Sequence, residues 1–264
     1  MSSMTTLFVL VPVLNEIGNI AQLMNSLKAL SVELKDQHDV EVILIDDGSR
    51  DGTGGLAQRL ANESNQKLSV LRHEVNQGPG KAFATGFQHL TPLLGENDIV
   101  LTIEGDNTSR IELVKQMLTR LQEGFDVIFA SPYMYGGGII NTSAYRVFLS
   151  SMANLFVKEL LGLQGILTVS SFFRLYRSSA LIRMQNTYGT KIIERRGFEC
   201  MVEMAMKMVN MGITISEVPL LLDTKARVGR SRMNVMKTII GYLGLWSLKR
   251  KWLTQASQRG WNRG

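Results

Sequence analysis

Short apolar runs alternate with stretches of helical spacing along the first half of the chain. Five continuous runs, each short enough for a buried strand of a parallel sheet, span residues 7–13, 40–45, 68–71, 98–103 and 126–130. Apolar residues also recur every three or four positions, which predicts helices over residues 17–30, 56–62, 82–90 and 111–121. Strands and helices that alternate at this spacing are typical of βαβ units. We therefore predict an α/β fold with a mostly parallel central sheet flanked by helices.

The pattern changes after residue 131, where strand and helix no longer alternate regularly. The pattern there predicts a triple-glycine loop, a helix, an apolar aromatic segment, a second helix and a strand, at residues 136–138, 143–161, 166–176, 198–211 and 213–218. An amphipathic segment then runs from residue 233 to residue 252. We expect one domain over residues 1–232 and a basic amphipathic C-terminal segment over residues 233–264.

Composition narrows the class of partner. The 264 residues carry a net charge of +6, and basic side chains are concentrated after Lys225. This charge suits an anionic membrane surface or phosphorylated small molecules, whereas the lack of a base-stacking aromatic array disfavours nucleic acid. The single Cys200 excludes a disulfide framework. The start of the chain lacks the basic region of a secretory signal, and no run reaches the roughly 18 apolar residues of a spanning helix. We therefore expect a cytoplasmic protein, soluble or peripheral to a membrane.

The sequence DDGSRDGT at residues 46–53 directly follows one of the predicted buried strands. Ligands of open α/β sheets collect at the carboxyl ends of the strands, and two acids placed there are costly to desolvate without a partner. Asp46 and Asp47 are therefore candidates for a ligand site. The alternative is an Asx-type turn that caps the next helix.

A second acidic strand end and a glycine-rich loop follow. Glu104, Gly105 and Asp106 come directly after the strand at 98–103, and both carboxylates can turn toward one Mg²⁺ or Mn²⁺. The alternative for this triplet is a solvated turn, but a second acidic strand end favours a shared site. The loop NQGPGKA at 76–82 offers backbone amides and Lys81, without the spacing of a Walker loop or a dinucleotide fingerprint.

Arg146 and Ser150 lie four residues apart on a predicted helix, so they share a face and could hold an oxyanion together. An ordinary solvated helix face is the alternative. The three histidines, His38, His73 and His89, follow no metal-ligand spacing, and we interpret them as surface residues.

The order of these motifs resembles glycosyltransferase family 2, the inverting enzymes of the GT-A fold. The resemblance rests on VPVLNE at 11–16, DDGSRDGT at 46–53, NQGPGKA at 76–82 and the acid-x-acid triplet at 104–106. The second half is similar to the branch that contains dolichol-phosphate mannose synthase and the polyprenyl-phosphate glycosyltransferases. Its matching segments are SPYMYGGG, YRVFLSSMANLF, SSFFRLYR, GFECMVEM and EVPLLL…GRSRM, at 131–138, 145–156, 170–177, 197–204 and 217–233.

The resemblance implies a role for each matching residue. The donor side of the site would comprise Pro12, Leu14, Glu16, Asp46, Asp47, Lys81, Glu104, Gly105, Arg230 and Arg232. Pro12, Leu14 and Glu16 would line a nucleoside pocket, and Asp47 would bind the base or ribose. Glu104 and Asp106 would hold Mg²⁺ or Mn²⁺ on the donor diphosphate. The catalytic set would be Asp106 with Arg146 and Ser150, the last two gripping the acceptor phosphate.

These roles are chemically coherent. A metal at the diphosphate stabilises the charge that develops on the leaving group, and arginine forks suit phosphate oxygens. A lipid phosphate has a second pKa near about 6 by analogy with protein phosphomonoesters, so it is already an anionic nucleophile at neutral pH. Positioning and electrostatics can then supply most of the rate.

The chain departs from the pattern of that branch at several positions. Glu104 stands for the first aspartate of Asp-x-Asp, and Arg232 for the lysine of the closing loop. Pro132 replaces an expected arginine, Thr168 an expected aspartate and Phe172 an expected glycine. Pro132 and Thr168 affect the acceptor side more than the donor side.

The leading hypothesis is a metal-dependent transferase that moves a hexosyl unit from a GDP- or UDP-sugar to a polyprenyl or dolichyl phosphate at the cytoplasmic face of a membrane. The amphipathic tail could lie in a lipid interface, or it could pack on the domain. Contact with the membrane would be peripheral or through a partner subunit. The alternatives are the same fold with a glycan hydroxyl as acceptor, and a nucleotide-sugar-binding protein with little turnover.

Overall fold

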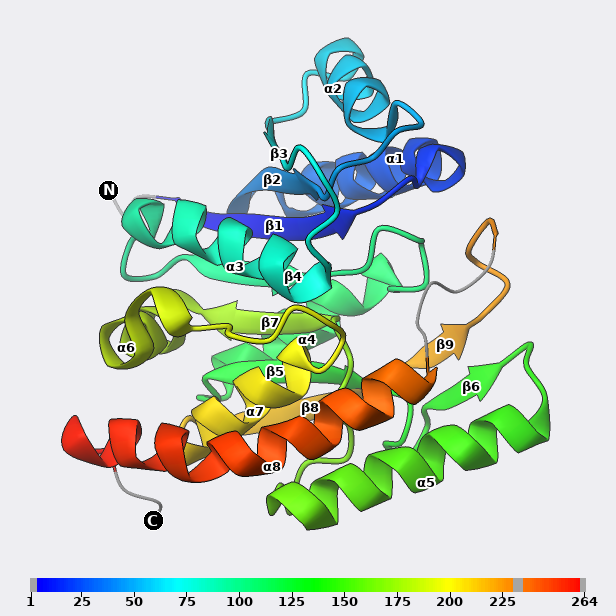
Figure 1. Cartoon of the computed structure of the whole chain (residues 1–264). Helices are drawn as coiled ribbons and strands as arrows, with labels where there is room; N and C mark the ends of the chain where they lie inside the picture. Colours follow the sequence, from blue (N-terminus) through cyan, green and yellow to red (C-terminus); the bar gives the residue numbers. More distant parts are fainter. Residues whose placement is uncertain (1–3, 230–234, 262–264) are drawn as a thin grey trace.

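A seven-stranded sheet forms the centre of the computed structural model, which describes residues 4–229 and 235–261 (Figure 1). Its strand order is β3-β2-β1-β4-β7-β5-β8. The strands are β1 (Thr5–Val13), β2 (His38–Asp46), β3 (Leu68–Arg72), β4 (Ile99–Thr102), β5 (Val127–Ser131), β7 (Arg174–Arg177) and β8 (Ile215–Pro219). Strand β7 pairs antiparallel with β4 and β5, whereas the other pairs of this sheet are parallel. The prediction of an α/β fold with a mostly parallel sheet is confirmed.

The helices and the smaller elements complete the chain. The helices are α1 (Ile17–Leu34), α2 (Thr53–Glu63), α3 (Pro79–Leu90), α4 (Val114–Gln122), α5 (Ala144–Leu161), α6 (Ser178–Tyr188), α7 (Cys200–Asn210) and α8 (Val235–Gln258). Short 3₁₀ turns are η1 (Thr91–Leu93), η2 (Ile111–Leu113) and η3 (Gly189–Lys191). Strands β6 (Gly138–Ile140) and β9 (Leu221–Asp223) form a separate parallel pair. The sequence interpretation included every helix except α6, and it missed β6, β9 and the antiparallel strand β7.

Local sequence explains where the main helices begin and end. Pro79 occupies the first turn of α3, where its missing N–H costs nothing. The hydroxyl of Ser143 accepts a hydrogen bond from the backbone N–H of Arg146 and caps α5. Helix α5 ends at Gly162, whose φ of 68° lies in the left-handed region that glycine adopts without steric cost.

Two apolar clusters cover the two faces of the sheet. Along β1, Leu7 and Val9 face one cluster while Phe8 and Leu10 face the other, as the two-residue repeat of a strand requires. Helices α1, α2 and α4 contribute to the first cluster, and α3, α5, α6, α7 and α8 to the second. Both faces of β1 are therefore buried, which explains its uninterrupted apolar run.

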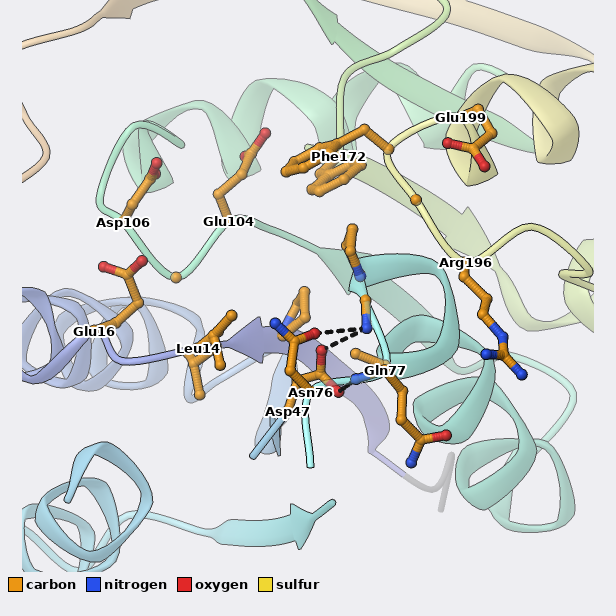
Figure 2. Close-up of a pocket in the computed structure, with 18 of the residues that line it drawn as sticks. Leu14, Glu16, Asp47, Asn76, Gln77, Glu104, Asp106, Phe172, Arg196 and Glu199 are labelled. Carbon is orange, nitrogen blue, oxygen red and sulfur yellow. Dashed lines mark hydrogen bonds between the residues drawn. The ribbon is translucent and has the colours of Figure 1, made fainter. Parts of the chain in front are cut away.

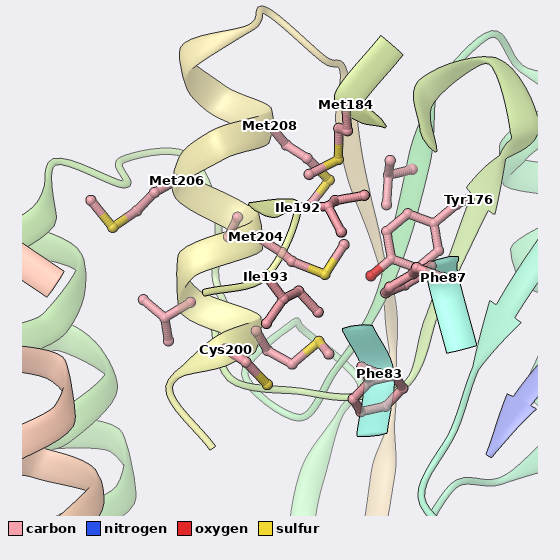
Figure 3. Packing of buried hydrophobic residues seen from close by; sticks show 14 of the residues in the cluster. Phe83, Phe87, Tyr176, Met184, Ile192, Ile193, Cys200, Met204, Met206 and Met208 are labelled. Atoms are coloured by element: carbon pink, nitrogen blue, oxygen red, sulfur yellow. The ribbon is translucent and has the colours of Figure 1, made fainter. Parts of the chain in front are cut away.

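The second cluster is rich in methionine (Figure 3). Met184 of α6 and Met204 and Met208 of α7 pack with Phe87 and Tyr176 near the antiparallel strand β7. Unbranched thioether side chains fill irregular gaps well. Cys200 is a free, buried thiol at the start of α7, and burial raises its pKa. It behaves as a small apolar residue here rather than as a nucleophile.

A buried ion pair lies within α7 and faces the chain that precedes this helix. Lys207 Nζ contacts Glu203 Oε1 at 2.5 Å, and both side chains are 0% exposed. The ammonium group also donates to the carbonyl of Lys191 at 2.6 Å and lies 4.7 Å from the ring centre of Trp252. Burial lowers the pKa of Lys207 and raises the pKa of Glu203, while the mutual attraction acts in the opposite sense on each.

Helix α8, which forms the described part of the C-terminal segment, is packed into the molecule along one side. Leu245, Trp252 and Ala256 are 0% exposed and belong to the methionine-rich cluster. The opposite side of the same helix leaves Leu243 and Trp246 exposed. The alternative in which the tail packs on the domain therefore describes one face of α8. Contact of the exposed face with a lipid interface stays a prediction.

We predict that Lys207→Met lowers the free energy of unfolding by about 3–5 kcal/mol, because it leaves the Glu203 carboxylate buried without its counter-charge. Denaturant unfolding followed by circular dichroism measures the change. The double variant Glu203→Gln/Lys207→Met should recover part of the loss. An unchanged free energy in the single variant would show that the pair contributes nothing to stability.

Candidate functional site

A cleft of about 1190 Å³ opens where the carboxyl ends of β1, β2 and β4 meet (Figure 2). Its lining includes Pro12, Val13, Leu14, Glu16, Asp47, Glu104, Gly105 and Asp106 from these strand ends. The remaining walls come from residues 76–79 and Ala82, from Ser170 and Phe172, from the 195–199 loop before α7, from residues 227–229, and from Ile240 and Gly241 of α8. The cleft thus lies where ligands of open α/β sheets are expected.

Asp47 is buried and fully engaged at one end of the cleft (Figure 2). Its carboxylate accepts hydrogen bonds from the backbone N–H groups of Gln77 at 2.9 Å and Gly78 at 2.8 Å. His73 Nδ1 lies 2.6 Å from the same carboxylate, and His73 Nε2 lies 3.0 Å from the Thr85 hydroxyl. These partners offset the desolvation of Asp47. The interpretation of His73 as a surface residue is wrong, because its imidazole is buried between these two groups.

The glycines of the 76–82 loop permit a close backbone contact. A Cβ on Gly80 would lie 1.9 Å from the carbonyl oxygen of Arg195, and a Cβ on Gly78 would lie 2.4 Å from that of Arg196. The N–H of Gly80 donates to the Arg196 carbonyl at 2.9 Å. The 76–82 loop therefore joins Asp47, at the end of β2, to the 195–199 loop. Lys81 is partly buried on α3 and is not among the residues that line the cleft.

Carboxylates gather at the other end of the cleft, where Figure 2 shows Glu16, Glu104 and Asp106. Asp106 Oδ1 accepts hydrogen bonds from the N–H of Thr108 at 3.1 Å and from its hydroxyl at 2.5 Å. Asp106 Oδ2 pairs with Arg227 at 2.9 Å. Glu104 accepts a hydrogen bond from the Ser109 hydroxyl. Burial, and then the charge of Asp106, raise the pKa of Glu104.

Gly105 separates the two acids because β1 passes very close. A Cβ at this position would lie 2.6 Å from Val13 Cγ1 and 3.1 Å from the Pro12 carbonyl oxygen. The strand ends of β1 and β4 are therefore in contact at the floor of the cleft.

The two carboxylates of the acid-x-acid triplet suit a hard divalent cation that also binds a substrate. Mg²⁺ and Mn²⁺ sites of this kind use one or two carboxylates, and phosphates and water complete the coordination. Glu104 and Asp106 of the cleft lining would supply the two carboxylates. Within residues 4–229 and 235–261, no three acidic, histidine or cysteine side chains form a complete cage. The residues present thus fit a cation held partly by a phosphorylated ligand.

The wall between the acids and α8 is aromatic. Phe172 stacks on Phe198 with ring centres 5.6 Å apart and planes at 3°, and it makes a T-shaped contact with Phe83 with ring centres 5.2 Å apart. Gly241 of α8 packs so closely that a Cβ there would lie 2.9 Å from the Glu199 carboxylate. This wall places an apolar surface between the carboxylates and the C-terminal helix.

Several predicted site residues lie outside the cleft lining. Asp46 is buried and accepts the N–H of Ser49 at 2.9 Å, so it holds the turn after β2. Arg146 is exposed on α5, and the Ser150 hydroxyl lies 2.7 Å from that of Tyr133. Arg230 and Arg232 lie outside the described residues. The roles expected for these side chains stay predictions.

Thr168 lies in a loop whose backbone is held by Glu217. The backbone N–H groups of Leu167 and Thr168 donate to the two carboxylate oxygens of Glu217 at 2.7 and 2.8 Å. Glu217 is buried on β8, which raises its pKa. Glu217 thus fixes this loop by its backbone. Thr168 does not line the cleft.

Four charged residues of the cleft were not predicted from the sequence, and these are Arg195, Arg196, Glu199 and Arg227. The first three precede or belong to the GFECMVEM segment, and the fourth immediately precedes the VGRSR loop. A cluster of basic residues beside each motif was the available signal. The structure adds that Arg195 Nε lies 3.4 Å from Glu199 Oε1.

A family model for glycosyl transferase family 2 matches residues 8–184, more than half of the sequence, so the chain belongs to this family and is a glycosyltransferase. Among curated relatives, a polyprenol monophosphomannose synthase of Mycolicibacterium smegmatis is 28% identical over 195 residues, 74% of this chain and 71% of that protein. An undecaprenyl-phosphate mannosyltransferase of Micrococcus luteus is 24% identical over 245 residues, 92% of this chain and 94% of that protein.

Solved structures support the GT-A type of fold. Glucosyl-3-phosphoglycerate synthase from Mycobacterium tuberculosis, solved with Mn²⁺, uridine diphosphate and glucosyl-3-phosphoglycerate, superposes with a TM-score of 0.57. The sequences are 18% identical, and the match covers 97% of this chain and 80% of that one. The likeness at this identity concerns the fold.

We predict that Mn²⁺ binding weakens as the pH falls, and that the loss begins at a higher pH than for an ordinary glutamate. A raised pKa keeps the Glu104 carboxyl protonated to higher pH, and a cation needs the deprotonated form. Calorimetric titration with Mn²⁺ between about pH 5 and pH 8 measures this dependence. Glu104→Gln should flatten it, whereas Glu112→Gln, at an exposed carboxylate nearby, should not. Identical profiles for the first variant and the unaltered protein would contradict the prediction.

Proposed function

We propose that the protein transfers a hexosyl unit from a nucleotide sugar to a polyprenyl phosphate at a membrane surface. The observation that carries this proposal is the position of Ile240. This side chain lines the polar cleft and, at 65% exposure, also belongs to an extended apolar surface outside it. A substrate with a phosphate head and a long apolar chain matches such an arrangement.

The donor would lie between Asp47 and the carboxylate end of the cleft. Pro12, Leu14 and the loop fixed by Asp47 enclose the side expected to hold the nucleoside. A Mg²⁺ or Mn²⁺ ion held by Glu104 and Asp106 would supply charge stabilisation for the departing diphosphate. Arg227 and the side chains of the 195–196 pair add positive charge to the same cleft.

The reaction needs no strong base. An oxygen of the acceptor phosphate forms a bond to the anomeric carbon while the bond from that carbon to the nucleoside diphosphate breaks. The electron pair leaves with the diphosphate, and the sugar is inverted. Because the attacking phosphate is already anionic near neutral pH, no proton has to be removed from it. The threonine at position 168, in place of an aspartate, is compatible with this chemistry.

Exposed apolar residues on α5 and α8 form what we call the α5–α8 surface. It comprises Tyr145, Phe148, Leu149, Met152, Leu155 and Phe156 of α5 with Ile240, Leu243 and Trp246 of α8. Phe148 is 59% exposed and Trp246 is 63% exposed. Apolar surface of this extent marks an interaction site rather than ordinary solvent contact. The two helices pack against each other, so the exposed apolar residues belong to neighbouring elements.

The charge around this surface favours a lipid bilayer with anionic headgroups. Helix α8 contains no aspartate or glutamate, and it carries Lys249, Arg250 and Lys251. Helix α5 has a single acid, Glu159. Basic residues beside apolar side chains are the pattern of interfacial helices. Of the helices in the described ranges, none is long and apolar enough to cross a membrane.

The two curated relatives support the acceptor class, because one is named as a synthase of polyprenol monophosphomannose and the other as an undecaprenyl-phosphate mannosyltransferase. Arg146 and Ser150 belong to α5, the helix that supplies most of the α5–α8 surface. Their predicted contact with an acceptor phosphate would place that phosphate beside the membrane-facing helix.

A transfer assay tests the proposal. Purified protein is incubated with radiolabelled GDP-mannose or UDP-glucose, Mn²⁺, and anionic vesicles that contain undecaprenyl phosphate. We expect label in an acid-labile lipid product. Asp106→Ala should reduce transfer by about a hundredfold or more, because a ligand for the cation at the leaving diphosphate is lost, while its circular dichroism spectrum stays unchanged.

The double variant Phe148→Ser/Trp246→Ser distinguishes the lipid acceptor from a hydroxyl acceptor. It should sediment less with vesicles and transfer less to them, yet bind nucleotide as before, since neither side chain lines the cleft. Transfer to a soluble glycan with no lipid product would contradict the proposal. So would full lipid transfer by Asp106→Ala.

A further inference from the structure

The segment after β9 lies across the carboxylate end of the cleft. Arg227 Nη2 contacts Asp106 Oδ2 at 2.9 Å, with both side chains about one-fifth exposed, at 21% and 18%. The buried Nε–H of Arg227 has no hydrogen-bond partner among the residues that the structure describes. This guanidinium therefore pairs with a predicted metal ligand and retains an unused donor.

Asn19 of α1 holds this segment by hydrogen bonds to the backbone of Val228. Its side-chain oxygen accepts the N–H of Val228 at 2.8 Å, and its amide group donates to the Val228 carbonyl at 3.2 Å. The same amide group donates to Glu16 Oε2 at 2.5 Å. The backbone carbonyl of Asn19 accepts a hydrogen bond from the Asn107 side chain at 3.0 Å, next to Asp106. Asn19 thus links the segment, the cleft acid Glu16 and the turn that carries Asp106.

We propose that Arg227 is a binding residue for the donor diphosphate that changes partner during binding, and that Asn19 is its positioning residue. The proposal rests on the proposed function for the identity of the donor as a nucleoside diphosphate sugar. Arg227 leaves Asp106 when a divalent cation binds to Oδ2, and its planar fork then pairs with diphosphate oxygens.

Repulsion between the two positive charges explains why Arg227 would leave Asp106 when a cation binds there. Asp106 Oδ1 already accepts two hydrogen bonds from Thr108, so Oδ2 is the oxygen with the capacity to bind a cation. A guanidinium and a divalent cation cannot both lie against one carboxylate oxygen without strong mutual repulsion. A diphosphate brings enough negative charge to attract both. Arginine is suited to it, because its fork can bind two phosphate oxygens at once.

Other cleft arginines differ from Arg227 in their partners. Arg195 pairs with Glu199, which lies by α8 rather than at the acid-x-acid triplet. Among the ion pairs of the described residues, only the pair with Arg227 includes Glu104 or Asp106. This juxtaposition predicts that one substitution changes the affinities for metal and for nucleotide in opposite directions.

The test is a pair of binding measurements on the full chain, with Arg227→Met as the variant. Calorimetry with Mn²⁺ alone should show affinity about tenfold higher than for the unaltered protein, because the competing cation is gone. With Mn²⁺ at saturation, GDP or UDP should bind about tenfold more weakly, because a charged hydrogen-bonding partner is lost. Lys225→Met is the matched control, since it removes the same charge from an exposed position in the same segment. It should change neither affinity appreciably.

Asn19→Ala tests the positioning role separately. The loosened segment should expose the Arg227 peptide bond, so limited trypsin digestion should cleave there several-fold faster, while the Mn²⁺ affinity rises as in Arg227→Met. Equal cleavage rates would overturn the role of Asn19.

An Mn²⁺ affinity that is unchanged or lower in Arg227→Met would overturn the exchange, and so would unchanged nucleotide affinity. Neither measurement contains an acceptor, so both can succeed even if no lipid product forms, in which case only the proposed acceptor fails. If the unaltered protein binds no Mn²⁺ and no nucleotide, the proposed function and this inference both fail.

Discussion

The site depends on the hydrogen bonds and the ion pair that the buried carboxylate of Glu203 makes. This carboxylate accepts the backbone N–H groups of Glu194 and Arg195, both at 2.8 Å, and it is neutralised by Lys207. Glu203 thereby fixes the 195–199 loop. The backbone carbonyls of this loop contact Gly78 and Gly80, and its side chains line the cleft. An unpaired charge there would be costly, so the loop is held in one arrangement.

The same network reaches the C-terminal helix. Trp252 Nε1 donates to Glu194 at 2.6 Å, and Lys251 donates to the other oxygen of that carboxylate at 2.6 Å. Helix α8 is thereby anchored at its C-terminal half, while its Gly241 packs on Glu199 and its Ile240 lines the cleft. A helix that could be regarded as an appended tail is therefore part of the cleft wall. Contact of its outer face with a membrane would bring the cleft to the lipid.

Sequence periodicity was enough to predict most of the fold. The runs at 7–13 and 40–45 became β1 and β2, because strands buried on both faces leave an uninterrupted apolar pattern. Strand β7 could not be separated from the aromatic segment in which it begins. Its antiparallel position between β4 and β5 depends on pairing with strands that are distant in the sequence. Helix α6 starts directly after β7, so no loop marked its beginning.

For the site, the sequence located the strand-end acids but not their partners. Asp47, Glu104 and Asp106 follow predictable strand ends. The burial of His73 against Asp47, the packing of Gly80 on Arg195, and the pairing of Arg227 with Asp106 all join residues that are distant in the chain. Such contacts depend on tertiary structure, and no local pattern encodes them. The glycine-rich loop, which could have been an anion cradle, is explained by this close packing.

We propose that one cleft holds the nucleoside near Asp47 and the diphosphate near Asp106 and Arg227. The decisive measurement is a crystal structure of the protein with Mn²⁺ and a nucleoside diphosphate. We expect the metal on Asp106, the diphosphate within hydrogen-bonding distance of Arg227, and the base beside Leu14 and the loop held by Asp47. A nucleotide bound elsewhere on the protein, or one bound in this cleft with Arg227 still paired to Asp106, would contradict it.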